Sequence, residues 1–175
     1  MADIVVDGVL KKDSGYYGSN YGDYTLNNSA GTVVVDENST LTSWATIDNL
    51  ITEDQTVAVE SHSNIKNLTI GGGHVYNYQN IGTAVVNRGS LGNGGWDTNN
   101  NAGSPITGAT VSKVILNGGS VINFAHSESI GPYERGQIDS VVINSGNLTN
   151  YGYVKEVEFY SGRIILDTKD SQSDR

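Results

Sequence analysis

The sequence predicts an all-β fold, a single-stranded parallel β-helix (β-solenoid) of about seven coils. Three observations favour this class. Short runs of β-branched residues alternate with Gly, Asn and Ser, and Gly accounts for 22 of the 175 residues while Pro accounts for only 2. No stretch repeats apolar residues at the i, i+3, i+4, i+7 spacing of a helix over several turns. One phrase also recurs along the chain with a base period of 16 residues.

The recurring phrase is clearest in "VILNGGSVINF" (114–124) and "VVINSGNLTNY" (141–151), which match position by position. A typical unit has a short apolar strand, a corner with Asn and Gly, a second apolar strand, and an Asn followed by an aromatic residue; the first two units are looser and lack the Gly. The units begin at Val33, Leu50, Leu68, Ala84, Val114, Val141 and Val157. A further apolar residue precedes the last six units by three positions, at Ile47, Ile65, Ile81, Val111, Ile138 and Val154. The unit is too short for two helices, which need about 33 residues, and it suits one solenoid coil.

Equivalent positions of successive coils stack about 4.8 Å apart in such a fold, so each repeated column predicts a contact. The apolar columns predict four core pairs in particular: Val114 over Val141, Leu116 over Ile143, Val121 over Leu148, and Ile138 over Val154. A Gly column is expected at a tight corner, where Gly takes a positive φ without steric cost. It consists of Gly73, Gly89, Gly119, Gly146 and Gly162.

Asn and aromatic residues form further columns. The Asn columns are Asn87, Asn117 and Asn144, and then Asn77, Asn93, Asn123 and Asn150. A row of carbonyl oxygens suits a ligand or a metal, whereas amides at a corner also hydrogen-bond from coil to coil; we favour the ladder of hydrogen bonds. The aromatic column of Tyr78, Phe124 and Tyr151 is expected to stack between coils.

Three regions are expected along the chain. Residues 1–31 form an N-terminal cap with a Tyr- and Gly-rich loop that also suits binding contacts, residues 32–166 form the solenoid, and residues 167–175 form a polar tail. Two insertions lengthen the 16-residue period by 14 and 11 residues, and they lie within about 92–109 and 125–137. Both follow the same Asn column, so they should emerge side by side from one edge of consecutive coils.

The insertions are the main candidates for function, because binding residues commonly lie on loops held by a rigid frame. The candidate ligand-binding residues are Trp96, Asp97, Asn99, His126, Glu128, Tyr133, Glu134 and Arg135. Aromatic, carboxylate and amide groups suit a carbohydrate or a peptide; the alternative is that the insertions have no ligand. The segment "DTNNNAG" (97–103) resembles the start of a calcium loop. It has one carboxylate and no closing Glu, so we predict no metal and no other cofactor.

The carboxylates and histidines of the chain do not favour catalysis. Glycoside hydrolysis needs two carboxylates about 5–9 Å apart on one face. Glu158 stands alone in its predicted column, and His62, His74 and His126 share no metal-ligand spacing. We therefore predict no catalytic residues and no enzymatic activity.

Charge and composition narrow the partners. The formal net charge is −9, which disfavours binding to a nucleic-acid backbone or to an anionic lipid surface. The chain has no Cys, which removes disulfides, thiolate metal sites and thiol nucleophiles. Its apolar runs are too short to span a bilayer, so no membrane insertion by this segment is expected.

Four segments carry a resemblance to a known class of proteins: "VILNGGSVINF", "VVINSGNLTNYG", "AVVNRGSLGNGG" and "GTVVVDENSTLTS". They resemble the passenger-domain repeats of bacterial autotransporters and related surface adhesins, over about residues 32–166. The resemblance implies a right-handed parallel β-helix that is a fragment of a longer secreted chain, exposed at the bacterial cell surface. It implies adhesion, aggregation or biofilm formation, with a glycan or protein of a host or bacterial surface as partner and self-association as a further possibility. A phage tail fibre or spike segment is the second interpretation, and a polysaccharide-acting β-helix enzyme is the third.

Overall fold

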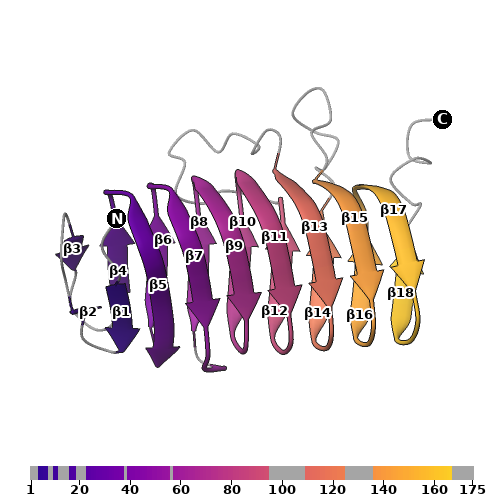
Figure 1. Cartoon of the computed structure of the whole chain (residues 1–175), viewed down its shortest axis with the longest axis horizontal. Helices are drawn as coiled ribbons and strands as arrows, with labels where there is room; N and C mark the ends of the chain where they lie inside the picture. Colours follow the sequence, from indigo (N-terminus) through magenta and orange to yellow (C-terminus); the bar gives the residue numbers. More distant parts are fainter. Residues whose placement is uncertain are drawn as a thin grey trace.

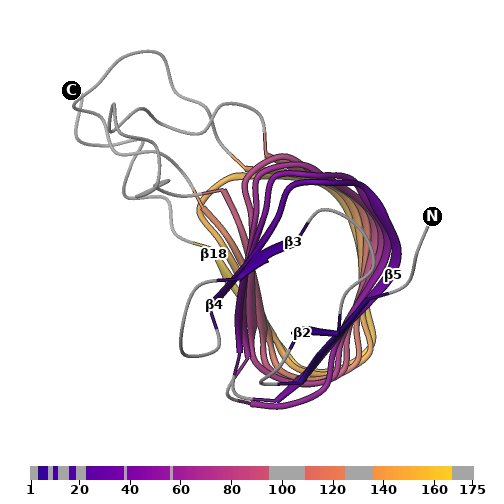
Figure 2. The same cartoon turned by 90° about the vertical axis from the view of Figure 1, so that its left-hand side faces the viewer.

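The computed structural model describes residues 4–7, 10–11, 16–18, 23–37, 39–55, 57–94, 109–124 and 136–166. Their regular structure is entirely β, and the strands form two sheets that face one another along the molecule. Figure 1 shows the strands side by side along the long axis, and Figure 2 shows the coils superimposed in an oval outline. The chain is therefore a parallel β-solenoid, as the sequence predicts. The number of coils and the handedness stay predictions.

The first sheet contains the longer strands. In chain order they are β1 (Ile4–Asp7), β2 (Leu10–Lys11), β5 (Ala30–Glu37), β7 (Ile47–Thr52), β9 (Asn64–Ile70), β11 (Asn80–Val86), β13 (Thr110–Leu116), β15 (Gln137–Ile143) and β17 (Tyr153–Phe159). Neighbours from β1 through β5 to β17 pair in parallel, and β2 pairs antiparallel with β1. The sheet therefore grows by one parallel strand with each repeat.

The second sheet contains the shorter strands. They are β3 (Tyr16–Gly18), β4 (Asp23–Leu26), β6 (Thr40–Ser43), β8 (Ala58–Ser61), β10 (His74–Asn77), β12 (Ser90–Asn93), β14 (Ser120–Asn123), β16 (Asn147–Asn150) and β18 (Arg163–Leu166). Here β4 to β18 pair in parallel, and β3 pairs antiparallel with β4. Each repeat thus contributes one strand to each sheet.

The strand register confirms the repeat read from the sequence. The seven predicted unit starts are paired in succession, and so are the six preceding apolar residues. The four predicted core pairs are also confirmed, including Val114 with Val141 and Val121 with Leu148. Apolar side chains of both sheets meet between them in one buried cluster. The stacked apolar columns therefore form the core, and complete burial of their side chains stabilises the fold through the hydrophobic effect.

Each long strand bends before it reaches its corner. In β15, Ile138 and Val141 are buried, while the two residues between them, Asp139 and Ser140, both lie outside the core. A regular strand would alternate, so two consecutive outward residues mark a change of direction. The bend gives the coil the oval outline of Figure 2 from only two sheets.

Two kinds of corner join the strands. The glycine corner leads from a long strand to a short one and holds the Gly column, whose φ angles lie between 72° and 112°. A Cβ at Gly119 would overlap the carbonyl oxygen of Gly89 in the coil before it. The predicted reason for this column, a left-handed backbone at a tight turn, is confirmed. The asparagine corner leads from a short strand to the next long one and takes two residues, such as Tyr78 and Gln79.

The two ends of the solenoid differ. At the N-terminal end each sheet finishes in an antiparallel strand, β2 or β3, whereas at the C-terminal end the last described strands, β17 and β18, are parallel (Figure 1). Tyr24, part of the Tyr-rich N-terminal segment, lies in the core at 6% exposure. Capping by residues 1–31 stays a prediction, and the tail of residues 167–175 lies outside the described residues. The described part of the chain has no helix long and apolar enough to cross a membrane.

Candidate functional site

A buried ladder of Asn side chains follows the asparagine corner along the solenoid. The amide of Asn77 donates to the side-chain oxygen of Asn93 at 2.8 Å. Asn93 donates to Asn123, and Asn123 to Asn150, each at 2.9 Å. The first three residues are fully buried. Buried amides need such partners, so the ladder interpretation is confirmed and these oxygens are occupied by neighbouring amides.

The same amides also hold the chain where it enters the next long strand. Asn93 donates to the backbone oxygens of Ala109 and Gln137, at 3.4 and 3.1 Å. Asn123 donates to the oxygens of Gly136 and Tyr153, at 2.9 and 3.1 Å. Each Asn therefore ties the end of a short strand to the residue that starts the following coil, with Ala109 and Gly136 lying just after the insertions.

The insertions split two asparagine corners. Gly94 and Ala109 occupy the two positions that Tyr78 and Gln79 fill in the coil before, since Gly94 N bonds to Asn77 O and Thr110 N bonds to Gln79 O. The second insertion follows Phe124 in the same way and ends before Gly136. Strand β12 extends to Asn93, so the first insertion starts later than the predicted residue 92. Strand β15 starts at Gln137, so the second insertion ends before the predicted residue 137.

The bases of the insertions lie side by side, as predicted. Asn93 pairs with Asn123 in the second sheet, and Thr110 pairs with Gln137 in the first. A Cβ on Gly94 would lie 3.6 Å from the Cα of Gly136. Both segments therefore leave one edge of the solenoid at adjacent coils.

The predicted ligand-binding residues themselves lie outside the described residues. They are Trp96, Asp97, Asn99, His126, Glu128, Tyr133, Glu134 and Arg135. The structure thus fixes their points of attachment and leaves their ligand-binding role a prediction.

The aromatic column differs from the one read in the sequence. Tyr78 and Phe124 are not in adjacent coils, because Gly94 occupies the position between them. The ring contacts of the described residues run the other way: His62 stacks on Trp44 with centroids 4.1 Å apart and lies 5.0 Å from Tyr78. The first units lack the Gly of the repeat, so Trp44 and His62 were not aligned with Tyr78. Trp44, His62 and Tyr78 each directly follow the short strand of their coil, and this shared position could have predicted the contact.

Trp44 and His62 differ in exposure. Trp44 is 48% exposed, whereas only 5% of the His62 side chain is exposed. The Nε2 atom of His62 lies 3.7 Å from Glu60 Oε2. This aromatic edge, Trp44, His62 and Tyr78, lies on the asparagine corner just before the coils that carry the insertions. An indole with an open surface next to a carboxylate suits contact with a sugar or an aromatic side chain.

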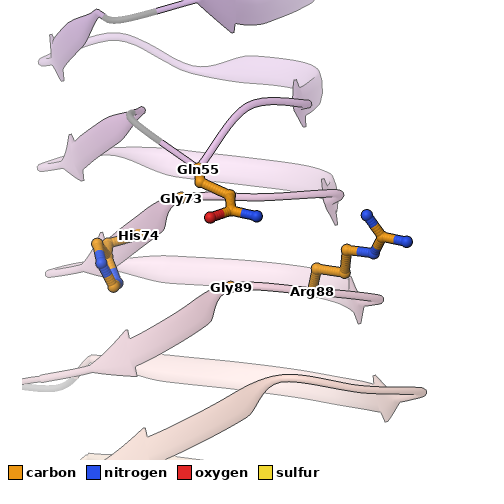
Figure 3. Close-up of a pocket in the computed structure, with 5 residues that line it drawn as sticks. All are labelled: Gln55, Gly73, His74, Arg88 and Gly89. Carbon is orange, nitrogen blue, oxygen red and sulfur yellow. The ribbon is translucent and has the colours of Figure 1, made fainter.

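A second polar surface lies at the glycine corner, on the other side of the coil. It is a shallow pocket of about 240 Å³ lined by Gln55, Gly73, His74, Arg88 and Gly89 (Figure 3). The ring of His74 contacts the hydroxyl of Ser90 through Nδ1. Arg88 is exposed, and no described residue forms an ion pair with it. The pocket combines a guanidinium, an imidazole and an amide, which together suit a hydroxyl-rich or anionic group.

The glycine corner also carries an exposed Asn ladder. Asn117 donates to Asn87 at 2.9 Å and Asn144 donates to Asn117 at 2.8 Å. Its geometry equals that of the buried ladder, but water competes for these amides, so it contributes less to stability.

Titratable groups give little sign of acid–base chemistry within the described residues. The pKa of Tyr160 is raised above its ordinary value by a hydrogen bond to Glu158 and by the charge of that carboxylate. Both side chains are exposed on the last coil. Among the described residues, no three His, Asp or Glu side chains are grouped so that they could hold a metal ion.

Comparison of the chain with family models, with curated proteins and with solved structures finds no match. The resemblance to passenger-domain repeats therefore rests only on the four sequence segments quoted above.

Proposed function

We propose that this chain is a non-enzymatic adhesin or aggregation module of an extracellular bacterial surface. In this proposal the solenoid is a rigid frame, and the two insertions on its asparagine edge bind a glycan or a protein of a host or bacterial surface. The quoted segments that resemble adhesin repeats support the class of protein. The attachment of the insertions supports the mode of binding.

The observation that carries the proposal is the buried clamp at the insertion bases. Asn93 and Asn123 hold each coil closed with hydrogen bonds to Ala109 and Gly136, whatever lies between. The frame is thereby independent of the insertion sequences, which are then available for recognition. In this proposal the two insertions, attached at adjacent coils, contact the ligand together.

The aromatic edge extends that surface with described residues. Trp44 and Tyr78 lie in the same column as Gly94 and Phe124, where the insertions leave the frame. The exposed indole of Trp44, which stacks on His62, offers a stacking face, and the Glu60 carboxylate beside His62 offers a hydrogen-bond acceptor. This favours a glycan as ligand, since sugars combine apolar ring faces with hydroxyls.

The test compares the full chain with a variant that lacks residues 95–108 and 125–135. Both proteins are applied to a glycan array and to intact bacterial and host cells. We expect the full chain to bind and the variant to lose binding by at least about tenfold, while circular dichroism shows the same β content. Equal binding by the two proteins, or no binding by the full chain to any of these surfaces, would contradict the proposal.

Matched substitutions locate the contact. Trp96→Ala and Tyr133→Ala should each weaken binding, because aromatic residues dominate many recognition surfaces. Arg88→Ala, in the pocket on the opposite corner, is the control and should leave binding unchanged. Loss of binding with Arg88→Ala alone would move the site to the glycine corner.

One observation favours a second candidate, a phage tail fibre or spike segment. The outer face of the first sheet carries a half-buried column of Val34, Ile51, Thr69, Val85, Ile115 and Val142. Such a stripe suits lateral association of solenoids in a trimer. A trimer in solution that Val85→Lys dissociates would support this candidate over the adhesin.

A further inference from the structure

Exposed apolar side chains gather at the C-terminal end of the solenoid. Among the described residues, nine large hydrophobic side chains are exposed, and seven of them lie between residues 151 and 166. They are Tyr151, Tyr153, Val157, Phe159, Tyr160, Ile165 and Leu166. The last described coil, β17 and β18, therefore presents an apolar surface.

Several of these residues belong to core columns. Val157 pairs with Val141 and Phe159 pairs with Ile143. Val141 is 1% exposed and Ile143 is fully buried, whereas Val157 is 46% and Phe159 50% exposed. The difference arises because the inner residues are covered by a described coil on both sides, while the last described coil has such a neighbour on one side only. The C-terminal face is thus an open cross-section of the core.

The two ends of the solenoid are not equivalent in this respect. At the N-terminal end an antiparallel strand finishes each sheet, β2 in the first and β3 in the second. At the C-terminal end β17 and β18 are parallel strands with a free edge among the described residues (Figure 1). A free edge of unpaired N–H and C=O groups favours pairing with another strand.

The charges of the last coil suit a partner of the same kind. The coil carries two basic residues, Lys155 and Arg163, and two acidic ones, Glu156 and Glu158. It is neutral, although the chain as a whole has a net charge of −9. Two such faces therefore meet without the repulsion that the rest of the surface would cause.

We propose that the C-terminal face is the interface of a two-fold symmetric dimer with a second copy of this chain. A two-fold axis perpendicular to the solenoid places β17 antiparallel to the β17 of the other copy. Antiparallel strands must oppose inward with inward residues and outward with outward ones. The pattern around the bend allows this, because the outward residues Lys155 and Glu156 are flanked by the inward residues Val154 and Val157.

The charges fix this register. When Val154 opposes Val157 of the other copy, Lys155 opposes Glu156 of the other copy, and the symmetry produces the pair twice. Opposite charges directly across an antiparallel pair stabilise it, and like charges destabilise it. The apolar columns of the two copies then cover one another as successive coils do within one chain.

The dimer does not depend on the proposed adhesin activity. It would double the number of insertion pairs on one particle and so raise binding to a surface by avidity. A dimer without ligand binding, or ligand binding by a monomer, would separate the two proposals.

The test is the oligomeric state of the full chain by sedimentation equilibrium, from about 1 to 500 µM protein. We expect a reversible monomer–dimer equilibrium. Lys155→Glu should weaken the dimer by about tenfold or more, because both ion pairs become repulsive. The exchange Lys155→Glu with Glu156→Lys should restore dimerisation to within about threefold.

Lys113→Glu is the matched control, since Lys113 occupies the column of Glu156 two coils earlier and faces solvent. It should leave the dimer unchanged. All these positions are exposed, so the variants should fold, which thermal unfolding checks. A monomer over the whole range, filaments or trimers in place of dimers, or failure of the charge exchange to restore binding would overturn the proposal. A chain ending at Leu166 that dimerises when the full chain does not would overturn it too, because residues 167–175 would then occupy the face.

Discussion

The glycine and asparagine corners of the same coil hold the chain by different means. At the glycine corner the backbone alone makes the turn, with Gly89 and Gly119 at φ 73° and 72° and each Gly against the backbone of the coil before it. At the asparagine corner side chains make the connection: Asn93 and Asn123, which precede the insertions, donate to the backbone oxygens of Ala109 and Gly136, which follow them. Both insertions split the second kind of corner.

The difference explains where this fold accepts change. A turn made by the backbone has no room for a Cβ, and each of the five corners that hold the Gly column takes three residues. A turn held by side chains needs only the two points that the Asn amide reaches, so its length is free. Repeat proteins commonly place variable segments on one edge, and here the buried ladder is the physical reason.

The largest effect is expected from Gly119→Ala. The substitution forces a positive φ on a residue with a Cβ and places that Cβ against Gly89 O, so we expect a loss of about 3 kcal/mol or more in the free energy of unfolding. Urea unfolding measures it. Ser145→Ala, in the glycine corner of the next coil, is the control and should change stability by less than about 0.5 kcal/mol. A loss of under about 1 kcal/mol for Gly119→Ala would show that the backbone is not what limits this corner.

The two Asn ladders give an intermediate effect and a direct comparison. Asn123→Ala removes a fully buried amide together with its hydrogen bonds to Asn93, Gly136 and Tyr153, and we expect it to cost about 2–3 kcal/mol. Asn117→Ala removes amide bonds of the same length at an exposed position and should cost about 0.5 kcal/mol. Denaturant unfolding of both variants tests this. Equal losses would mean that burial of the first ladder does not set its contribution.

The smallest effect is expected from deletion of an insertion. Removal of residues 95–108 joins Gly94 to Ala109 and restores the two-residue corner seen at Tyr78 and Gln79. Stability should stay within about 1 kcal/mol of the full chain, because closing a flexible loop costs little and depends weakly on its length. Thermal unfolding of the deletion variant measures the change. Loss of the folded state would show that the inserted residues support the frame.

The sequence was most informative where the repeat is regular. Val114, Val141 and their columns were placed correctly because a fixed period allows only one stacking register. The aromatic column was wrong for Tyr78, because Gly94 separates it from Phe124, whereas Phe124 and Tyr151 do occupy the same position of adjacent coils. Trp44 and His62 were missed because the early coils are longer: these two residues are 18 residues apart. The alignment of these two residues depends on the lengths of the corners in the early coils, which the 16-residue period does not predict.

The sequence by itself determined the fold class, the core columns, the glycine corner and the hydrogen-bonding role of the Asn residues. Each of these follows from a local residue pattern that recurs at a fixed interval, so that every coil makes the same contacts. The tertiary structure decided what depends on neighbours in space. Burial made one Asn ladder a clamp and left the other exposed. Val157 and Phe159 are exposed although they continue core columns, because no described strand covers them on the C-terminal side. A residue type sets what a side chain can do, and the number of coils that cover it sets what it does.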